Sequence, residues 1–145
     1  LSQLNDNNDF SSPDGLYFDP RGVLWIQTDD GAYTDTSSCM LLAALPGKVS
    51  DGSMTTTSAG QLTRVGTSAS NDNIKRFFVG PEGCEVTGIT MAPDFKTLFI
   101  NIQHPGNTWG AVAGGSIPRS ATVMITREDG DVILAESFDT ADSTT

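Results

Sequence analysis

Carboxylate side chains stand at two corresponding places in this sequence, each at the start of an apolar segment. Asp14 precedes Gly15 in the first place, and Glu85 lies within Gly83–Thr87 in the second. Carboxylates that gather at one point repel one another unless a cation neutralises them, and hard cations such as Ca²⁺ prefer oxygen ligands. Both residues are therefore candidate metal ligands. The alternative for Asp14 is a turn-capping role, whereas a charge such as Glu85 beside an apolar strand normally needs a partner.

Further candidate ligands follow the next apolar segment in each half. Asp29 comes directly after this segment in the first half, with Asp30 and Asp35 close behind, and Gln103 and His104 end it in the second half. Hard metals bind carboxylate and amide oxygens, and histidine serves as a metal ligand or a general acid. The competing interpretations are a solvated acidic loop for the aspartates and a turn residue before proline for the histidine.

Three other features suggest chemistry less specifically. Arg119 follows a Gly-rich stretch and could clamp an anion through two parallel hydrogen bonds, with an ordinary surface arginine as the alternative. Asp6-Asn-Asn-Asp9 has the composition of a calcium loop without the spacing of an EF-hand. Cys39 and Cys84 can pair or stay reduced, and neither belongs to a CxxC zinc motif.

A hairpin that occurs twice must position these residues. It covers 11–29 and again 83–105, and in each copy a turn containing Pro leads into a strand rich in β-branched and aromatic residues. The aligned pairs are Gly15 with Gly88, Pro20 with Pro93, Trp25 with Phe99, and Ile26 with Ile100. A unit that recurs after about 73 residues is typical of propellers, solenoids and arrays.

The strands that the sequence predicts alternate with turns and are short, as in a meander. They cover residues 15–18, 23–28, 39–45, 61–65, 74–79, 86–91, 98–103, 121–126 and 132–136. For 39–45 a helix is the alternative, because Met, Leu and Ala also favour helices. The predicted fold is all-β, with about two four-stranded antiparallel blades of a β-propeller.

The expected organisation is a single propeller segment over 1–145. Blade one covers about 10–80 with a long polar loop inserted at about 46–73, blade two covers about 84–137, and a flexible tail follows at 138–145. Because propellers need about four to eight blades to close a ring, we expect a C-terminal segment of a longer propeller. The remaining blades of the parent chain are then its partners.

Composition and charge exclude several classes of partner. The 145 residues carry a formal net charge of −10, with an isoelectric point near 4.2, so nucleic acid and anionic membrane surfaces repel the chain. No segment approaches the roughly 18 apolar residues of a membrane-spanning helix, so no integral membrane segment is expected. An acidic chain fits a secreted or periplasmic protein and equally a calcium binder.

Several strings in the sequence resemble the PhoX-type alkaline phosphatase family. The most specific are Gly83-Cys-Glu-Val-Thr-Gly88 and Asn101-Ile-Gln-His-Pro105. They are supported by Ser12-Pro-Asp-Gly-Leu16, Leu24-Trp-Ile-Gln-Thr-Asp29, Phe77-Phe-Val-Gly-Pro81, Pro93-Asp94 and Pro118-Arg-Ser120. The resemblance covers about 10–45 and 74–135, whereas 46–73 looks like an insertion.

This resemblance implies a six-bladed, secreted or periplasmic propeller that hydrolyses phosphomonoesters at an axial site holding calcium and iron. It implies that Asp14 and Glu85 are the best metal-ligand candidates and that Arg119 faces the substrate phosphate. Weaker candidates are Asp29, Gln103 and His104. Since the family site draws on several blades, we expect these 145 residues alone to be inactive. The alternatives are a lactonase-like calcium propeller hydrolase and a non-catalytic β module that binds calcium or a partner protein.

Overall fold

The described part of the protein is built from antiparallel β-strands. The computed structural model describes residues 3–34, 37–45, 53–65 and 69–134. The strands are β1 (Pro13–Phe18), β2 (Leu24–Thr28), β3 (Met40–Ala44), β4 (Met54–Thr56), β5 (Leu62–Arg64), β6 (Ile74–Val79), β7 (Glu85–Met91), β8 (Thr97–Gln103) and β9 (Ala121–Thr126). Among these residues there is no helix, and hence none that could cross a bilayer. The all-β prediction is confirmed.

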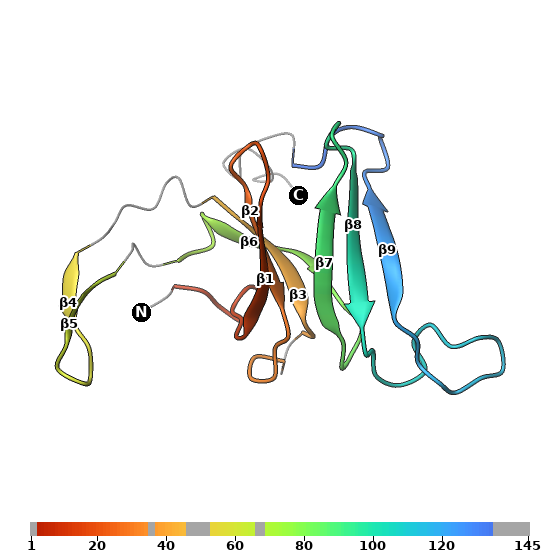
Figure 1. The fold of residues 1–145 in the computed structure, drawn as a ribbon, viewed down its shortest axis with the longest axis horizontal. Helices are drawn as coiled ribbons and strands as arrows, with labels where there is room; N and C mark the ends of the chain where they lie inside the picture. The colour runs from red at the N-terminus through yellow and green to blue at the C-terminus, as the bar shows by residue number, and fades with distance from the viewer. Residues whose placement is uncertain (1–2, 35–36, 46–52, 66–68, 135–145) are drawn as a thin grey trace.

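The first sheet contains four strands in the order β1-β2-β3-β6 (Figure 1). The turn between β1 and β2 is closed by hydrogen bonds from Gly22 N to Asp19 O (2.9 Å) and from Asp19 N to Val23 O (3.0 Å). Every residue of β3 is buried, because β2 and β6 pair with its two edges and apolar side chains cover both of its faces. The continuous apolar run is therefore a central strand, not a helix.

The second sheet contains β7, β8 and β9 in that order. Side chains of β8 alternate, so that Leu98, Ile100 and Ile102 are fully buried while Phe99 lies on the other face. The β7–β8 register shifts between Thr87 and Thr90, and Gly88 within this bulge has a φ of 62°. A left-handed backbone at a bulge favours glycine.

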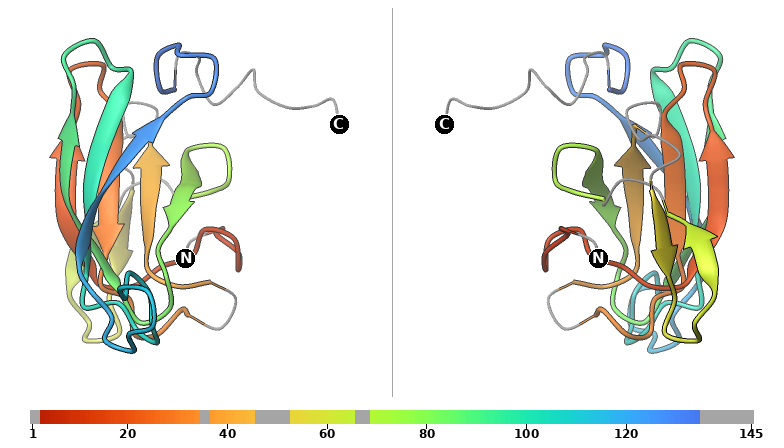
Figure 2. Two further views of the ribbon diagram at one scale, coloured as in Figure 1. Left: turned by 90° about the vertical axis from the view of Figure 1, so that its right-hand side faces the viewer. Right: turned by 90° about the vertical axis from the view of Figure 1, so that its left-hand side faces the viewer.

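The two sheets share one hydrophobic core. It contains Trp25, Leu41 and Ala43 from the first sheet, and Val86 and the buried side of β8 from the second. Trp25 is completely buried, with its ring edge-to-face to Phe77 at 5.0 Å between centroids. Side views show the β1–β2 and β7–β8 hairpins running alongside each other (Figure 2).

A cluster around Arg21 ties the two sheets together at the end of the hairpin turns. The Arg21 guanidinium pairs with the buried Asp19 carboxylate (2.6 Å), donates to Ile133 O (2.6 Å) and stacks 4.4 Å above the centroid of Phe95. Trp25 Nε1 also donates to Asp19 (3.2 Å). Although burial alone would raise the pKa of Asp19, hydrogen bonds from Arg21 and Trp25 and the arginine charge lower it.

Two predictions about the organisation are wrong in the described residues. Residues 132–134 form a turn and not the start of a strand at 132–136, because Ile133 pairs its N–H with Phe95 O (2.8 Å) and buries its side chain in the core. The region 46–73, expected to be mostly a loop with one short strand, carries the β4–β5 hairpin, in which threonines suit the strands and Gly60 (φ 78°) suits the turn. Residues 135–136 and the tail at 138–145 lie outside the described residues.

Candidate metal centre

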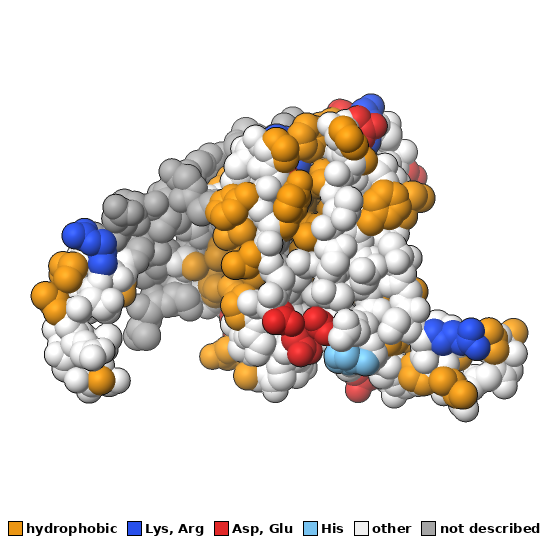
Figure 3. All heavy atoms as spheres, viewed as in Figure 1, with side chains coloured by type: hydrophobic (Ala, Val, Ile, Leu, Met, Phe, Trp, Pro, Cys, Tyr) orange, Lys and Arg blue, Asp and Glu red, His pale blue; other side chains and the backbone are white. Residues whose placement is uncertain are grey.

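Three side chains from three strand ends meet beside the contact between β2 and β7. Asp29 follows β2, Glu85 begins β7 and His104 follows β8. His104 Nε2 lies 3.6 Å from Glu85 Oε2 and 3.9 Å from Asp29 Oδ1. One ligand atom from each residue lies within 4.8 Å of the other two. Acidic side chains gather beside the histidine at this end of the sheets (Figure 3).

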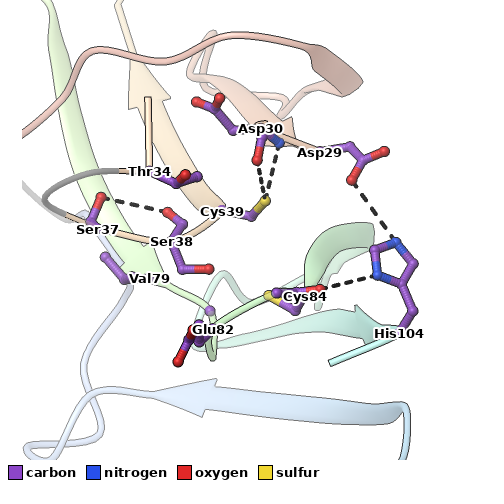
Figure 4. A pocket seen from close by; sticks show the side chains of 12 residues that line it. Asp29, Asp30, Thr34, Ser37, Ser38, Cys39, Val79, Glu82, Cys84 and His104 are labelled. Atoms are coloured by element: carbon purple, nitrogen blue, oxygen red, sulfur yellow. Dashed lines mark hydrogen bonds and ion pairs between the residues drawn. The ribbon is translucent and has the colours of Figure 1, made fainter. Parts of the chain in front are cut away.

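The backbone and hydrogen bonds of His104 direct its ring toward the carboxylates. Its φ is 34°, its N–H donates to Ser120 Oγ (3.2 Å), and its ring Nδ1 lies 3.2 Å from Gly83 O. In the tautomer in which Nδ1 donates to this carbonyl, the Nε2 lone pair is free to bind a cation. Figure 4 shows the ring facing Asp29 across the mouth of a cavity.

Glu85 is the electrostatically strained member of the cluster. Burial raises its pKa, as do the Asp29 charge and a hydrogen bond and charge from Asp14, whereas His104 opposes the increase. Two carboxyl groups form a hydrogen bond only when one of them is protonated. Asp14, a sequence-predicted ligand, therefore acts on Glu85 in a direction that a proton or a nearby cation would oppose.

The donor set fits the metals that the family resemblance implies. Asp14, Asp29 and Glu85 supply hard carboxylate oxygens, which calcium prefers, and His104 supplies an imidazole nitrogen, which suits iron. Burial and the charges of Asp29 and Asp14 disfavour the charged form of Glu85, and a bound cation would favour that form. These residues would hold such ions where the two sheets meet.

A cavity of about 500 Å³ lies beside the cluster and is lined by Asp29, Asp30, Cys39, Glu82 and His104 among others. Asp30 is not a free ligand here, because its carboxylate accepts hydrogen bonds from the N–H groups of Ser11 (2.8 Å), Ala32 (2.8 Å) and Tyr33 (2.9 Å). Burial alone would raise the pKa of Asp30, but these bonds and one from the Ser11 hydroxyl lower it. Asp30 thus organises the loop after β2.

Gln103 lies directly opposite Glu85 in the β7–β8 ladder. Residues opposite each other in an antiparallel pair have side chains on the same face, so Gln103 shares the face of Glu85. Its side chain is exposed and borders a shallow polar depression with Thr87, Asn101 and Thr122. The amide is therefore adjacent to the cluster without an observed contact to His104 or Asp29.

Arg119 lies on the connection between β8 and β9, next to Ser120, whose Oγ accepts the hydrogen bond from His104 N. Its side chain is exposed, and its backbone N–H donates to Trp109 O (3.0 Å). The Asp6-Asn-Asn-Asp9 segment forms a turn in which Asn8 N donates to Asn5 O (2.8 Å) and Asn8 Nδ2 to Ile74 O (2.9 Å). These bonds hold the segment as a turn against the first sheet. Asp35 lies outside the described residues.

Both cysteines are free and buried. Cys39 Sγ accepts a hydrogen bond from Asp30 N (3.0 Å), and burial, with a contribution from Cys39, raises the pKa of Cys84 to about 12. Thiols of this kind are packing groups with little thiolate at neutral pH.

The sequence analysis did not name Gln27, a buried polar residue of β2. The signal that could have identified it was its position in a buried strand, two residues before Asp29.

Comparisons with known proteins identify the family. The family described as "Alkaline phosphatase PhoX" matches residues 1–106. The solved structure of Pseudomonas fluorescens PhoX in complex with vanadate, a transition state analogue, is 40% identical to this chain, with a TM-score of 0.64. The alignment covers 87% of this chain and 19% of the Pseudomonas protein, so the chain spans about a fifth of its length. No curated protein gives a significant match. The chain belongs to the PhoX alkaline phosphatase family.

Proposed function

We propose that this chain is part of a metal-dependent phosphomonoesterase and contributes one side of its metal centre. The observation that carries the proposal is the convergence of Asp29, Glu85 and His104 at the junction of two sheets, with Asp14 contributing to the raised pKa of Glu85. The vanadate complex of the Pseudomonas relative supports a phosphoryl-transfer reaction in this family.

The charge of the protein explains why such an enzyme needs cations. A phosphate monoester is anionic, and a chain with a net charge of −10 repels it. When bound, calcium and iron reverse the local field, polarise phosphoryl oxygens and activate an oxygen nucleophile. Asp14, Asp29, Glu85 and His104 hold the ions in this proposal. Gln103, which lies opposite Glu85 in the ladder, completes the ligand set in this proposal.

Arg119 has a separate role in the proposal. Its connection is anchored beside the metal centre, since Gly106 N donates to Glu82 O (2.7 Å) and His104 N to Ser120 Oγ. An arginine on this connection suits bidentate recognition of a phosphate. We assign it to substrate binding, which predicts a larger effect on KM than on metal content.

The second sheet exposes an apolar face, and in the proposal the remaining blades of a propeller cover it. In the alignment of the two hairpins, buried Trp25 corresponds to Phe99, which is 36% exposed beside Met124 at 63%. The first sheet docks through its Trp25 face, so the Phe99 face of the second sheet is the equivalent docking surface. Head-to-tail contacts of this type generate rings when the rotation closes. We propose that further sheets complete the ring and supply more ligands, so that these 145 residues alone are inactive.

The cellular location in the proposal is the periplasm or the exterior. A phosphatase that acts on phosphate esters and requires calcium fits a compartment in which calcium is abundant. The strongly acidic composition is consistent with it.

The test uses the complete protein that contains this chain. Glu85→Ala and Asp14→Ala are expected to lower bound calcium or iron and phosphomonoesterase turnover together, and Arg119→Ala to raise KM with metal content retained. Glu128→Ala, at an exposed acidic residue after β9, removes the same charge as a control. Undiminished turnover in both carboxylate variants would defeat the assignment, and calcium binding without turnover would favour a binding module.

A further inference from the structure

Gln27 is a buried amide that reaches from the first sheet to the second. Its side chain is 4% exposed, and its Oε1 accepts a hydrogen bond from Ile89 N of β7 at 2.9 Å. Gln27 precedes Asp29 by two residues on β2, and Ile89 follows Glu85 by four on β7. The bond therefore joins the strands that carry two of the clustered carboxylates.

The Ile89 N–H is available because β7 bulges at this point. Thr87 lies opposite Asn101 and Thr90 opposite Phe99, so two residues of β7, Gly88 and Ile89, face a single residue of β8. A bulge leaves a backbone group without a ladder partner. Gln27 takes up the freed N–H, and a buried donor of this kind is costly to leave unpaired.

Gly15 provides the space in which the Gln27 amide lies. A Cβ at position 15 would overlap the amide nitrogen of Gln27. The same arrangement recurs in the second sheet, where a Cβ at Gly88 would overlap the amide of Asn101. An amide packed on the aligned glycine is thus a repeated feature of this chain, and in the first sheet it links to the next sheet.

We propose that Gln27 is a positioning residue for the metal centre. Its bond to Ile89 N fixes the position of β7 along the direction of β2. That position in turn sets the distance between Glu85 and Asp29. This inference rests on the proposed metal centre, because the separation matters only if both carboxylates bind one cluster of ions. Ligands must be held to within about 0.5 Å for productive geometry, so a small slide of β7 weakens binding.

The test compares variants of the complete protein by calcium titration after chelation. Gln27→Met keeps the size of the side chain but removes the acceptor, and is expected to weaken calcium affinity by about 10-fold or more. Gln27→Glu keeps an acceptor oxygen and is expected to preserve slow hydrogen exchange at the Ile89 amide, which Gln27→Met accelerates. Gly15→Ala displaces the amide from outside and is expected to weaken affinity in the same direction as Gln27→Met.

Asn8→Met is the matched control. Asn8 is also a buried amide, 3% exposed, and it bonds to Ile74 O on the first sheet, without linking the sheets. It is expected to lower thermal stability as Gln27→Met does, with calcium affinity within about 2-fold of the wild type. Wild-type affinity in Gln27→Met, or an equal loss in Asn8→Met, would overturn the positioning role alone. A wild-type protein that binds no calcium or iron would overturn the metal centre itself.

Discussion

Replacing Glu85 by glutamine is expected to stabilise the metal-free protein while weakening its metal binding. Glu85 is 7% exposed, and this burial together with the charges of Asp29 and Asp14 raises the pKa of its carboxyl group. Ligand atoms of Glu85 and Asp29 lie within 4.8 Å of each other, and at an effective dielectric constant of about 20 two unit charges at this separation repel by about 3 kcal/mol. Since the Asp29 side chain is 50% exposed, screening by solvent reduces the gain to about 1–2 kcal/mol.

The pH dependence of this gain follows from the direction of the pKa shift. The folded protein raises the pKa of Glu85 above its usual 4.5, so the folded state binds the proton more tightly than the unfolded state. Its stabilising contribution is complete below pH 4.5 and is lost as the pH rises through the raised value. Glu85→Gln is therefore expected to exceed the wild type in stability at pH 7 to 8 and to match it near pH 4.

The assay is urea unfolding of the complete protein in EDTA at several pH values, repeated with saturating calcium. Calcium at about 100 times its Kd stabilises the wild type by about 2.7 kcal/mol, so the order of stability of the two proteins reverses when calcium is added. Glu128→Gln controls for the loss of one negative charge at an exposed position. A Glu85→Gln variant that is less stable than the wild type in EDTA at pH 7 would refute the reasoning.

The other predictions concern stability, each measured by urea unfolding. Arg21→Ala is expected to lower the free energy of unfolding by about 3 kcal/mol, because it leaves the buried Asp19 carboxylate without its charged partner. Unchanged stability would contradict the role of Arg21 in holding the two sheets together. Gly88→Ala is expected to cost about 1–3 kcal/mol, since φ is 62° and the new methyl group meets the Asn101 amide; wild-type stability would mean that the bulge relaxes freely. Asp30→Asn is expected to cost about 2 kcal/mol at pH 7. Because folding lowers the pKa of Asp30, that cost disappears as the pH falls through the folded value, below 3.8, and a cost that persists there would exclude the carboxylate as its source.

Much of the fold was predictable because the strands carry strong local patterns. β8 alternates buried and exposed side chains, and its turn from β7 contains Pro93-Asp94, so the hairpin could be placed from the sequence. The turn at 132–134 could not, because its aliphatic residues are typical of a strand and only the docking of Ile133 into the core decides the outcome. The β4–β5 hairpin was missed in part because its strands are short and polar.

The candidate site was partly predictable for a similar reason. The hairpin repeat indicates that Asp14 and Glu85 occupy corresponding strand ends, and in the structure Asp14 contributes to the raised pKa of Glu85. The position of Arg119 depends on the path of the Gly-rich connection after β8, which no local pattern specifies. The role of Gln27 depends on how the two sheets dock, which no local pattern specifies. Asp29 remains a candidate ligand and Asp30 does not, because the backbone N–H groups of the loop donate to the Asp30 carboxylate.

The Arg21 cluster and the acidic cluster sit at opposite ends of the same pair of hairpins, about 20 Å apart for strands of six to seven residues. Arg21 therefore holds the two sheets together at one end, while the carboxylates at the other end repel one another. Without bound ions, the sheets are expected to separate at the acidic end and to stay together at the Arg21 end. Proteolysis and hydrogen exchange would then begin at the loops flanking Asp29 and His104, so that ions bound at the proposed metal centre would also protect the protein from degradation.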